Sequence, residues 1–463
     1  MGDRAMTREI RFNAFVVGRP VHQSPGLWRH PRDRSTAYKD LDYWVDLART
    51  LERGLFDAIF LADGIGPNDV YGGNLDAALT HGSQVPTNDP TLLIPAMAHA
   101  TRNLGFAVTG NLSFEPPYLF ARRFSTLDQL TRGRVGWNIV TGKSSAGAKG
   151  MGRDAIVPHD QRYDIADEFM EVVYKLWEGS WEDDAVLWDR DQGIFARPEK
   201  VHRVSHQGAH YKLDAIHLTE PSPQRTPVLF QAGGSTRGRA FAARHAEGVF
   251  LAAPTKTVAA KVISDVRRRA AENGRHPDDL LFFPLMTVIV GENERAARAK
   301  LAEYQSYISH QGALVLFSGW TGIDLAGRDL DEVLRYEDRD NGVVSTIEAF
   351  TVADPNRQWT LRDIARHAGI GGQGPVIVGS PVEVADEIEA WVEETGADGF
   401  NLAYAVAPET YVDFIDLVVP ELQRRGAYKS QYAAGTYREK LFGPGHARLA
   451  APHPGAGFRY DAA

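Results

Sequence analysis

The chain has 463 residues, of which 43% are apolar, and 51 Lys and Arg against 60 Asp and Glu leave a formal charge of −9 at pH 7. This length suits one large barrel or two to three smaller domains, and the acidic balance disfavours nucleic acid as a partner because phosphate contacts need a basic surface. The absence of Cys excludes disulfides, iron–sulfur clusters and thiol chemistry, so redox chemistry needs an organic cofactor or a His/carboxylate metal site.

The first residues lack the positively charged head and long apolar core of a secretion signal. The strongest apolar run, 280–290, is about half a membrane span long and contains Pro284. We therefore expect a soluble, cytoplasmic protein that makes no membrane contact.

Eight short apolar runs alternate with amphipathic helical segments, which is the pattern of parallel strands joined by crossover helices. The runs are almost continuously apolar, as strands buried on both faces are. No dinucleotide fingerprint follows the first run, so the sequence predicts an α/β fold of the (β/α)8 TIM-barrel type. Helical stripes are predicted over 41–51, 165–176 and 384–392, and strands over 10–17, 57–62, 104–110, 135–141, 227–232, 248–252, 281–290 and 399–406.

Residues 1–426 are predicted to form a single barrel, because no low-complexity linker divides them. Two segments, about 179–226 and 292–375, are too long for simple connections, and we expect them at the catalytic face as lids or oligomer contacts. Residues 427–463, rich in Gly, Pro, Ala and His near their end, are expected to form an extended arm.

Three histidines recur every four residues at positions 202, 206 and 210, a spacing that could build a metal site on a helix. However, Gln207 and Gly208 form a turn signal between two β-prone arms. We therefore predict a hairpin with solvated histidines and no metal requirement.

A glycine-rich turn, 233–239, directly follows the fifth predicted strand and opens a helix. Backbone N–H groups and the Ser235 hydroxyl would converge there on an anion, although such a turn can also be a mere tight connection. His159 and Tyr163 open the helix after the fourth strand, where they could face the same ligand or serve only as a helix cap and a packed ring.

Five motifs stand in order along the chain: LFDAIFLAD (55–63), PPYL with ARRFSTLDQL (116–130), GRVGWNIVT (133–141), HDQRY (159–163) and FQAGGS (230–235). With them the chain resembles the bacterial luciferase-like flavin monooxygenases from about residue 8 to residue 443. Within that family it looks like the branch with nitrilotriacetate, EDTA, dibenzothiophene-sulfone and dimethylsulfide monooxygenases. Segments such as HQSPGLWRHP (22–31) and DGFNLAYAV (398–406) look closest to the dimethylsulfide enzymes.

The resemblance implies a two-component monooxygenase. Such an enzyme takes reduced FMN (FMNH2) from a separate NADH-dependent flavin reductase and uses oxygen as co-substrate, through a flavin peroxide. A dry pocket and a homo-oligomer, a dimer or tetramer, are also expected. By matching positions, the cofactor-binding residues would be Asp63, Thr109, Asn138 and Thr141 near the ring, and His159, Tyr163, Gly234 and Ser235 at the phosphate.

Candidate catalytic residues are aromatic walls and titratable groups near the predicted mouth. Phe15, Trp28 and Phe56 would form an apolar wall, with Phe400 as a further member. His22 and His30 could steer proton transfer, although a loop histidine is often structural.

The substrate is expected to be a small, uncharged organosulfur or haloaromatic compound, because a multiply charged molecule would need several cations in the mouth. Arg29 and Arg32 could overturn this expectation if they fold inward. The alternatives left open are an aminopolycarboxylate monooxygenase of the same family, a deazaflavin-dependent oxidoreductase, and a flavin-binding protein without turnover.

Overall fold

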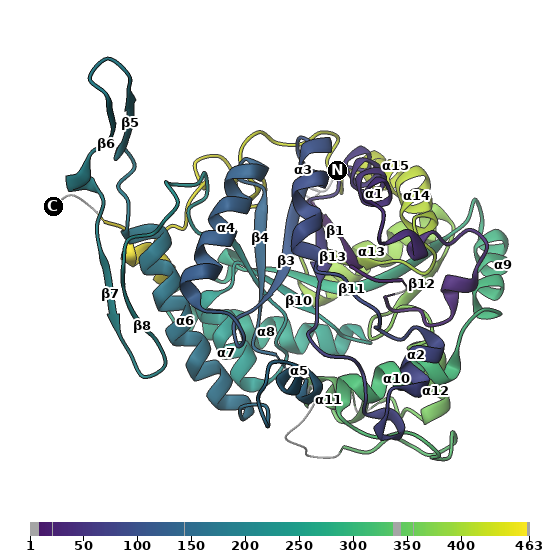
Figure 1. Cartoon of the computed structure of the whole chain (residues 1–463). Helices are drawn as coiled ribbons and strands as arrows, with labels where there is room; N and C mark the ends of the chain where they lie inside the picture. The colour runs from purple at the N-terminus through teal and green to yellow at the C-terminus, as the bar shows by residue number, and fades with distance from the viewer. Residues whose placement is uncertain (1–8, 21, 143, 337–343, 355, 461–463) are drawn as a thin grey trace.

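The computed structural model describes residues 9–20, 22–142, 144–336, 344–354 and 356–460. Its centre is a closed barrel in which each strand pairs in parallel with the next barrel strand along the chain, and the last pairs with the first (Figure 1). The predicted (β/α)8 barrel is thereby confirmed. The barrel strands are β1 (Arg11–Val17), β2 (Ala58–Ala62), β3 (Gly105–Asn111), β4 (Val135–Val140), β9 (Val228–Gln231), β10 (Gly248–Leu251), β11 (Leu281–Val290) and β13 (Gly399–Ala403).

One strand of the sheet was not predicted. β12 (Val376–Gly379) pairs with the carboxyl half of β11, from Thr287 to Val290, beyond the part of β11 that pairs with β10 and β13. It is only four residues long and mostly half-buried, so its pattern is too weak to read from the sequence.

The helices surround the barrel, and the three predicted stripes are confirmed. In α1, Trp44, Ala48 and Leu51 are at most 1% exposed, and the helix ends at Gly54 as expected. The helices are α1 (Leu41–Arg53), α2 (Asp76–His81), α3 (Ile94–Ala100), α4 (Pro117–Thr131), α5 (Ser145–Gly150), α6 (His159–Gly179), α7 (Thr236–His245), α8 (Lys256–Glu272), α9 (Glu294–Gln305), α10 (His310–Thr321), α11 (Val344–Thr351), α12 (Leu361–His367), α13 (Pro381–Thr395), α14 (Glu409–Asp413), α15 (Val419–Arg424) and α16 (Tyr437–Phe442). Among the described residues, none of the helices combines the length and apolar character needed to cross a membrane.

Four phenylalanines from four strands stack across the barrel interior. Phe15 stacks on Phe60 with ring centres 4.9 Å apart, Phe60 on Phe250 at 4.1 Å, and Phe250 on Phe230 at 4.8 Å. Alternate residues of each strand point inward, so large rings fill the layer and leave no open pore. This aromatic layer forms the floor beneath the carboxyl end of the barrel.

The segment after residue 426, expected as an extended arm, crosses the amino end of the barrel and contains α16 (Figure 1, yellow). Tyr437 and Leu441 of this helix pack into the interior cluster of the barrel with Phe230. A Cβ on Gly105 would lie 2.9 Å from the Tyr437 ring. The arm therefore plugs the end of the barrel opposite the carboxyl ends of the strands.

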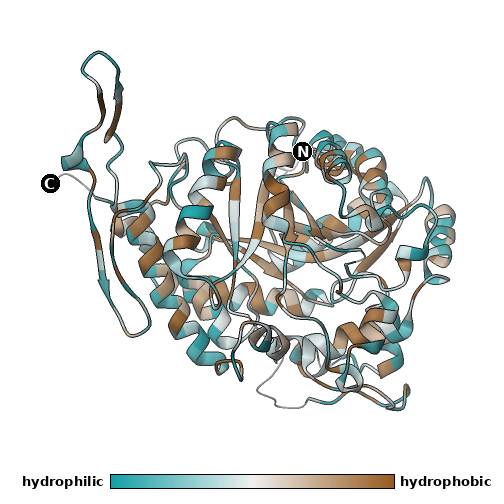
Figure 2. Cartoon of the chain, in the orientation of Figure 1, coloured by the Kyte–Doolittle hydropathy of each residue, from teal (hydrophilic) through white to brown (hydrophobic). Residues whose placement is uncertain are grey.

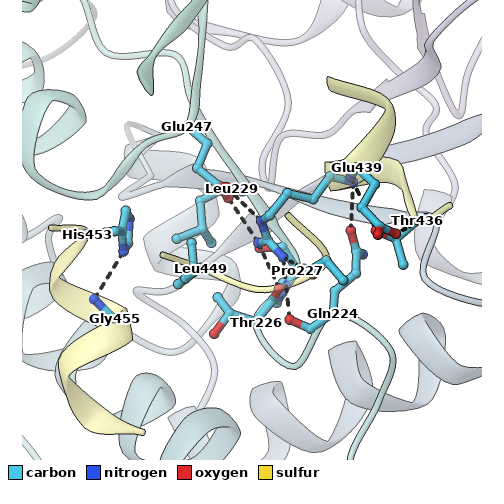
Figure 3. Close-up of polar contacts among 12 residues, drawn as sticks. Gln224, Thr226, Pro227, Leu229, Glu247, Thr436, Glu439, Leu449, His453 and Gly455 are labelled. Atoms are coloured by element: carbon cyan, nitrogen blue, oxygen red, sulfur yellow. Dashed lines mark hydrogen bonds and ion pairs between the residues drawn. The ribbon is translucent and has the colours of Figure 1, made fainter. Parts of the chain in front are cut away.

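A buried arginine fastens this arm. The Arg438 side chain is 2% exposed and donates to Glu247 at 2.7 Å, and to the carbonyl oxygens of Thr226, Pro227 and Ala447, each at 2.9 Å. Figure 3 shows the partners Thr226, Pro227 and Glu247 around the same side chain. The guanidinium thus joins the arm to the starts of β9 and β10.

The two insertions leave the barrel at different ends. The 292–375 segment follows β11, and its helices α10 and α12 lie with α2 at the carboxyl end of the strands (Figure 1); residues 337–343 and 355 lie outside the described part. The 179–226 segment follows α6, which runs back to the amino end. The 179–226 segment thus starts at the opposite end, while its residues 211–213 lie beside the loop after β3 at the carboxyl end. The expected role of both insertions as lids or oligomer contacts stays a prediction.

This second insertion folds into two hairpins. They are built from β5 (Val186–Asp189) with β6 (Ile194–Ala196), and β7 (Val204–Gln207) with β8 (Lys212–Ala215). The predicted hairpin over the three histidines is confirmed, but the prediction that they are solvated is wrong for His206. Its ring is 6% exposed and lies 3.1 Å from Glu168, because the hairpin packs along α6. Among the described residues, no three His, Asp or Glu side chains are grouped to hold a metal ion.

Candidate active site

The glycine-rich turn after β9 and the start of α6 meet at the carboxyl end of the barrel. Ser235 is the N-cap of α7, where its Oγ accepts from the Gly238 N–H at 3.1 Å and lies 3.2 Å from His159 Nε2. Tyr163 reaches the same turn, since a Cβ on Gly233 would lie 2.8 Å from its hydroxyl. The structure therefore brings His159, Tyr163 and Ser235 together beside Gly234; we call this group the cradle.

The cradle offers hydrogen-bond donors rather than a free cation. Burial raises the pKa of Tyr163, opposed by the hydroxyls of Ser235 and Thr141, so the phenol stays protonated and can donate. Arg237 in the first turn of α7 is paired with Asp164 at 2.7 Å and Asp167 at 3.0 Å. The N–H groups and dipole of the α7 N-terminus are thus left to attract an anion.

Thr109 and Asn138 lie side by side on β3 and β4, as their register requires. The Asn138 Nδ2 donates to Thr109 Oγ1 at 3.0 Å, while Asn138 Oδ1 is buried with no partner among the described residues. A buried acceptor without a donor is costly, so this oxygen suits a ligand that brings an N–H group. A flavin ring has such a group, and the residues present fit it.

Asp63 and Thr141 stand at the ends of β2 and β4. Asp63 is half-buried, and burial raises the pKa of its carboxyl, opposed by the Gly64 N–H and the charge of Arg19. Thr141 is half-buried, with its carbonyl oxygen accepting from the Ser113 hydroxyl at 2.7 Å. Both positions border the mouth above the aromatic floor.

Of the predicted wall, Phe15 belongs to the floor, and His22 packs edge-on against it with ring centres 4.1 Å apart. Trp28 is 40% exposed and lies at the surface beside Gly82. Phe56 is not at the mouth: it precedes β2 at the amino end and packs on Phe414. The assignment of Phe56 to the wall is wrong because a residue before the start of a barrel strand lies at the amino end, opposite the mouth.

Phe400 also faces away from the mouth. It stacks on Phe12 with ring centres 6.1 Å apart, on the face of the barrel that contacts the outer helices. Its neighbour Asn401 carries the inward position, paired in register with Asn13. The expectation for Phe400 is therefore wrong by one residue of strand alternation.

The two candidate histidines occupy different places. His22 is 3% exposed, and burial together with the charge of Arg19 lowers its pKa to about 3, so the ring is neutral at pH 7. His30 lies 3.1 Å from Glu303 on α9, with its ring edge-on to Tyr304. His30 therefore ties the first loop to the insertion and does not meet His22.

Two further features were missed from the sequence. Phe60, Phe230 and Phe250 complete the aromatic floor, and the signal for them is an aromatic residue near the carboxyl end of each strand. A Cβ on Gly372, at φ +66°, would lie 1.5 Å from Gln23 Oε1. The insertion thus packs directly on the loop that carries His22. Any side chain at position 372 would collide with Gln23, so this contact requires glycine.

Replacing His22 with glutamine should flatten the acid sensitivity of the fold. With a pKa of about 3 in the folded protein and 6.5 as its ordinary value, the site takes up a proton only on unfolding between these pH values. The stability contribution is present above pH 6.5 and lost as the pH falls, by about 1.4 kcal/mol per pH unit. Urea unfolding at pH 5 to 7.5 should show this slope reduced in His22→Gln relative to the wild type.

The comparisons with known proteins agree with this geometry. The family model described as luciferase-like monooxygenase matches residues 26–399. The chain is 49% identical to dimethyl-sulfide monooxygenase from Hyphomicrobium sulfonivorans over 98% of this chain and 94% of that protein. It is 46% identical to long-chain alkane monooxygenase from Geobacillus thermodenitrificans over 98% of this chain and 99% of that protein.

Among solved structures, the crystal structure of DmoA from Hyphomicrobium sulfonivorans superposes with a TM-score of 0.90, at 49% identity, covering 98% of this chain and 96% of that one. The resemblance inferred from the five motifs is confirmed, because both the sequence and the barrel match over nearly the full length. The chain belongs to the luciferase-like monooxygenase family.

Proposed function

We propose that the protein is the oxygenase of a two-component system, which uses FMNH2 and oxygen to oxidise a small, uncharged organosulfur or haloaromatic compound. The carrying observation is the cradle at the N-terminus of α7 together with the unpartnered Asn138 oxygen. When bound, the reduced flavin supplies the electrons that activate oxygen. A separate NADH-dependent flavin reductase would supply it, and names of relatives such as nitrilotriacetate monooxygenase component A support a second component.

FMN is proposed rather than FAD because the cradle offers a phosphate one helix N-terminus, and the sequence has no Gly-x-Gly-x-x-Gly motif for an adenylate half. His159, Tyr163, Ser235 and the α7 N–H groups would hold that phosphate, while Asn138 and Thr109 would hold the ring. Asp63 and Thr141 would border the ring at the mouth.

The remaining residues of the mouth would exclude water. The stacked Phe15 and Phe60 close the bottom, and neutral His22 can donate or accept a hydrogen bond there without carrying charge. The insertion over Gln23 covers the top. A dry site protects activated oxygen from wasteful release.

The surroundings favour an uncharged substrate. Arg29 donates to the Tyr307 carbonyl at 2.6 Å, and Arg32 is held by Glu303 and Glu409, so neither turns into the mouth. The buried Arg19 is balanced electrostatically by Asp63. A multiply charged chelate would therefore be desolvated without partners.

A substrate screen with a generic flavin reductase tests this function. Oxygen-dependent oxidation of a neutral sulfide or haloaromatic is expected, at rates above that of nitrilotriacetate. Faster turnover of nitrilotriacetate would favour the aminopolycarboxylate alternative. Hydride transfer with a reduced deazaflavin, or flavin binding with no turnover of any compound, would favour the other two readings.

Ser235→Ala should weaken the binding of reduced FMN about 5- to 30-fold, since one hydrogen bond to a charged phosphate contributes about 1–2 kcal/mol. Anaerobic fluorescence titration measures this dissociation constant. Thr255→Ala is the matched control, because Thr255 caps the next helix, α8, by the same bond to a backbone N–H. If both variants lost the same affinity for reduced FMN, the cause would be the lost helix cap, and Ser235 would not bind the phosphate.

We further propose that the protein acts in the cytoplasm as a homo-oligomer. The acidic, Cys-free composition supports the first part. The homo-oligomer is proposed because the chain belongs to the luciferase-like family.

A further inference from the structure

Arg237 lies beside the cradle but is paired away from it. It is the second residue of α7, after the Ser235 cap, and its guanidinium carbon lies 5.9 Å from the centre of the Tyr163 ring. Its Nη2 group donates to Asp164 at 2.7 Å and to Asp167 at 3.0 Å. Both aspartates belong to α6, which packs against α7 (Figure 1). Two carboxylates thus hold a cation close to the group that we propose for the phosphate.

The ion pair lies at the surface, so the fold depends little on it. The side chains of Arg237 and Asp164 are 31% and 61% exposed. Figure 2 shows that α6 and α7 alternate hydrophilic and hydrophobic stretches, as helices with one side toward solvent do. Ion pairs in such positions contribute little to stability. Removing the carboxylates should therefore release Arg237 rather than unfold the protein.

One of the two carboxylates is held in place by a second partner. Asp167 Oδ1 accepts from His245 Nε2 at 2.9 Å, and His245 Nδ1 accepts from the Tyr174 hydroxyl at 3.1 Å. His245 and Tyr174 are at most 2% exposed, so these bonds are shielded from water. Burial would raise the pKa of Asp167, but the bonds from His245 and Arg237 outweigh it and lower the pKa, so the carboxylate stays charged. An asparagine at this position can still accept from His245 but carries no charge.

The neighbouring arginines have other partners. Arg162, on α6, donates through Nη1 to the Val157 carbonyl at 3.0 Å. Arg244 lies 3.5 Å from Asp167, but it follows Arg237 at the far end of α7, about 10 Å along the helix axis. Arg237 is therefore the cation that a change of partner would bring to the cradle.

A stronger hold on the phosphate would not help the proposed reaction. Reduced and oxidised FMN carry the same phosphate, so an arginine bound to it stabilises both forms equally and does not select the reduced one. Arginine and phosphate form strong, often bidentate pairs. Reduced flavin must enter and oxidised flavin must leave in every turnover, so such a pair would chiefly slow the exchange.

We propose that Asp164 and Asp167 are positioning residues, which withhold Arg237 from the flavin phosphate and so keep the flavin exchangeable. The inference rests on the proposed function, because it requires FMN in the cradle. It adds two carboxylates of α6 as the groups that set how tightly the flavin is held.

Anaerobic titration with reduced FMN tests this role. The variant with both Asp164→Asn and Asp167→Asn should bind reduced FMN about 10- to 100-fold more tightly than the wild type at low salt, because a guanidinium–phosphate bond is charge-assisted. Adding Arg237→Gln to this variant should remove the gain. Asp331→Asn is the matched control, since it frees the exposed Arg362 in the 292–375 insertion, and it should leave the affinity unchanged. A gain in affinity cannot come from a misfolded protein.

Two further ligands show whether the phosphate is the group concerned. Reduced riboflavin lacks the phosphate, so its affinity should be equal in the wild type and in the double variant. Oxidised FMN should gain the same factor as reduced FMN. During turnover with a flavin reductase, the double variant should therefore be inhibited by lower concentrations of oxidised FMN than the wild type.

The same measurements separate this inference from the proposed function. A double variant that binds reduced FMN no more tightly than the wild type overturns the role of the aspartates. A gain that survives Arg237→Gln, or that appears equally with reduced riboflavin, overturns it as well. If Ser235→Ala weakens the binding of reduced FMN in these cases, the cradle still holds the phosphate and only this inference fails. If Ser235→Ala has no effect either, the proposed phosphate site fails with it.

Discussion

Replacing Arg438 with methionine is expected to lower the free energy of unfolding by about 3–5 kcal/mol. The substitution leaves the Glu247 carboxylate, 8% exposed, with only the Leu229 N–H at 3.0 Å among its buried donors, and removes the donors of three carbonyl oxygens. An unpaired buried charge costs far more than the pair itself contributes. Urea unfolding followed by circular dichroism measures the loss.

Two further variants identify its cause. Arg424→Met removes an exposed ion pair with Glu421 and should change stability little. Adding Glu247→Gln to Arg438→Met removes the stranded charge and should restore part of the loss. An Arg438→Met protein as stable as the wild type would show that the arm is held by apolar packing of Tyr437 and Leu441 alone.

Gly233→Val should weaken the binding of reduced FMN about 10- to 150-fold. Its Cβ would lie 2.1 Å from Gln231 Nε2 and 2.8 Å from the Tyr163 hydroxyl, so both side chains must shift and the Tyr163 hydroxyl is displaced from the cradle. Loss of its hydrogen bond to a charged phosphate is worth about 1.5–3 kcal/mol, which is this decrease in affinity. Anaerobic titration measures the affinity.

Gly150→Val provides the control, because a Cβ at Gly150 meets nothing within 4 Å. This variant should bind reduced FMN with wild-type affinity. Wild-type affinity of Gly233→Val, with the fold intact, would mean that the phosphate lies elsewhere and that Tyr163 is only a packed ring.

The strands and the cradle could be predicted because their signals are local. A strand buried on both faces is apolar throughout. Ser235 after two glycines predicts the start of a helix. The same continuity hides which side chains point inward: Phe15 lies inside the barrel, whereas Phe400 lies on the opposite face of its strand from the one expected. Phe56 was predicted to lie just before the second strand, and its assignment to the wall overlooked that strands start at the end opposite the mouth.

Long-range contacts left no trace in the local pattern. The burial of His206 depends on Glu168, which belongs to a helix far earlier in the chain. The plug formed by the arm depends on Arg438 meeting β9 and β10, and no motif in the arm announces it. Both contacts depend on where the segments after α6 and α15 run in space, which the local sequence pattern does not indicate.

The plug also sets the order of events during synthesis. The barrel closes only when β13 pairs with β1, and its interior is sealed only when Tyr437 arrives; Arg11 then donates to the Leu441 carbonyl, 430 residues away in sequence. A nascent chain that has exposed seven strands still has open sheet edges and an uncovered aromatic layer. The segment after residue 426 thus completes the surroundings of the first strand, and the aromatic layer of the growing chain stays uncovered until that segment has been made.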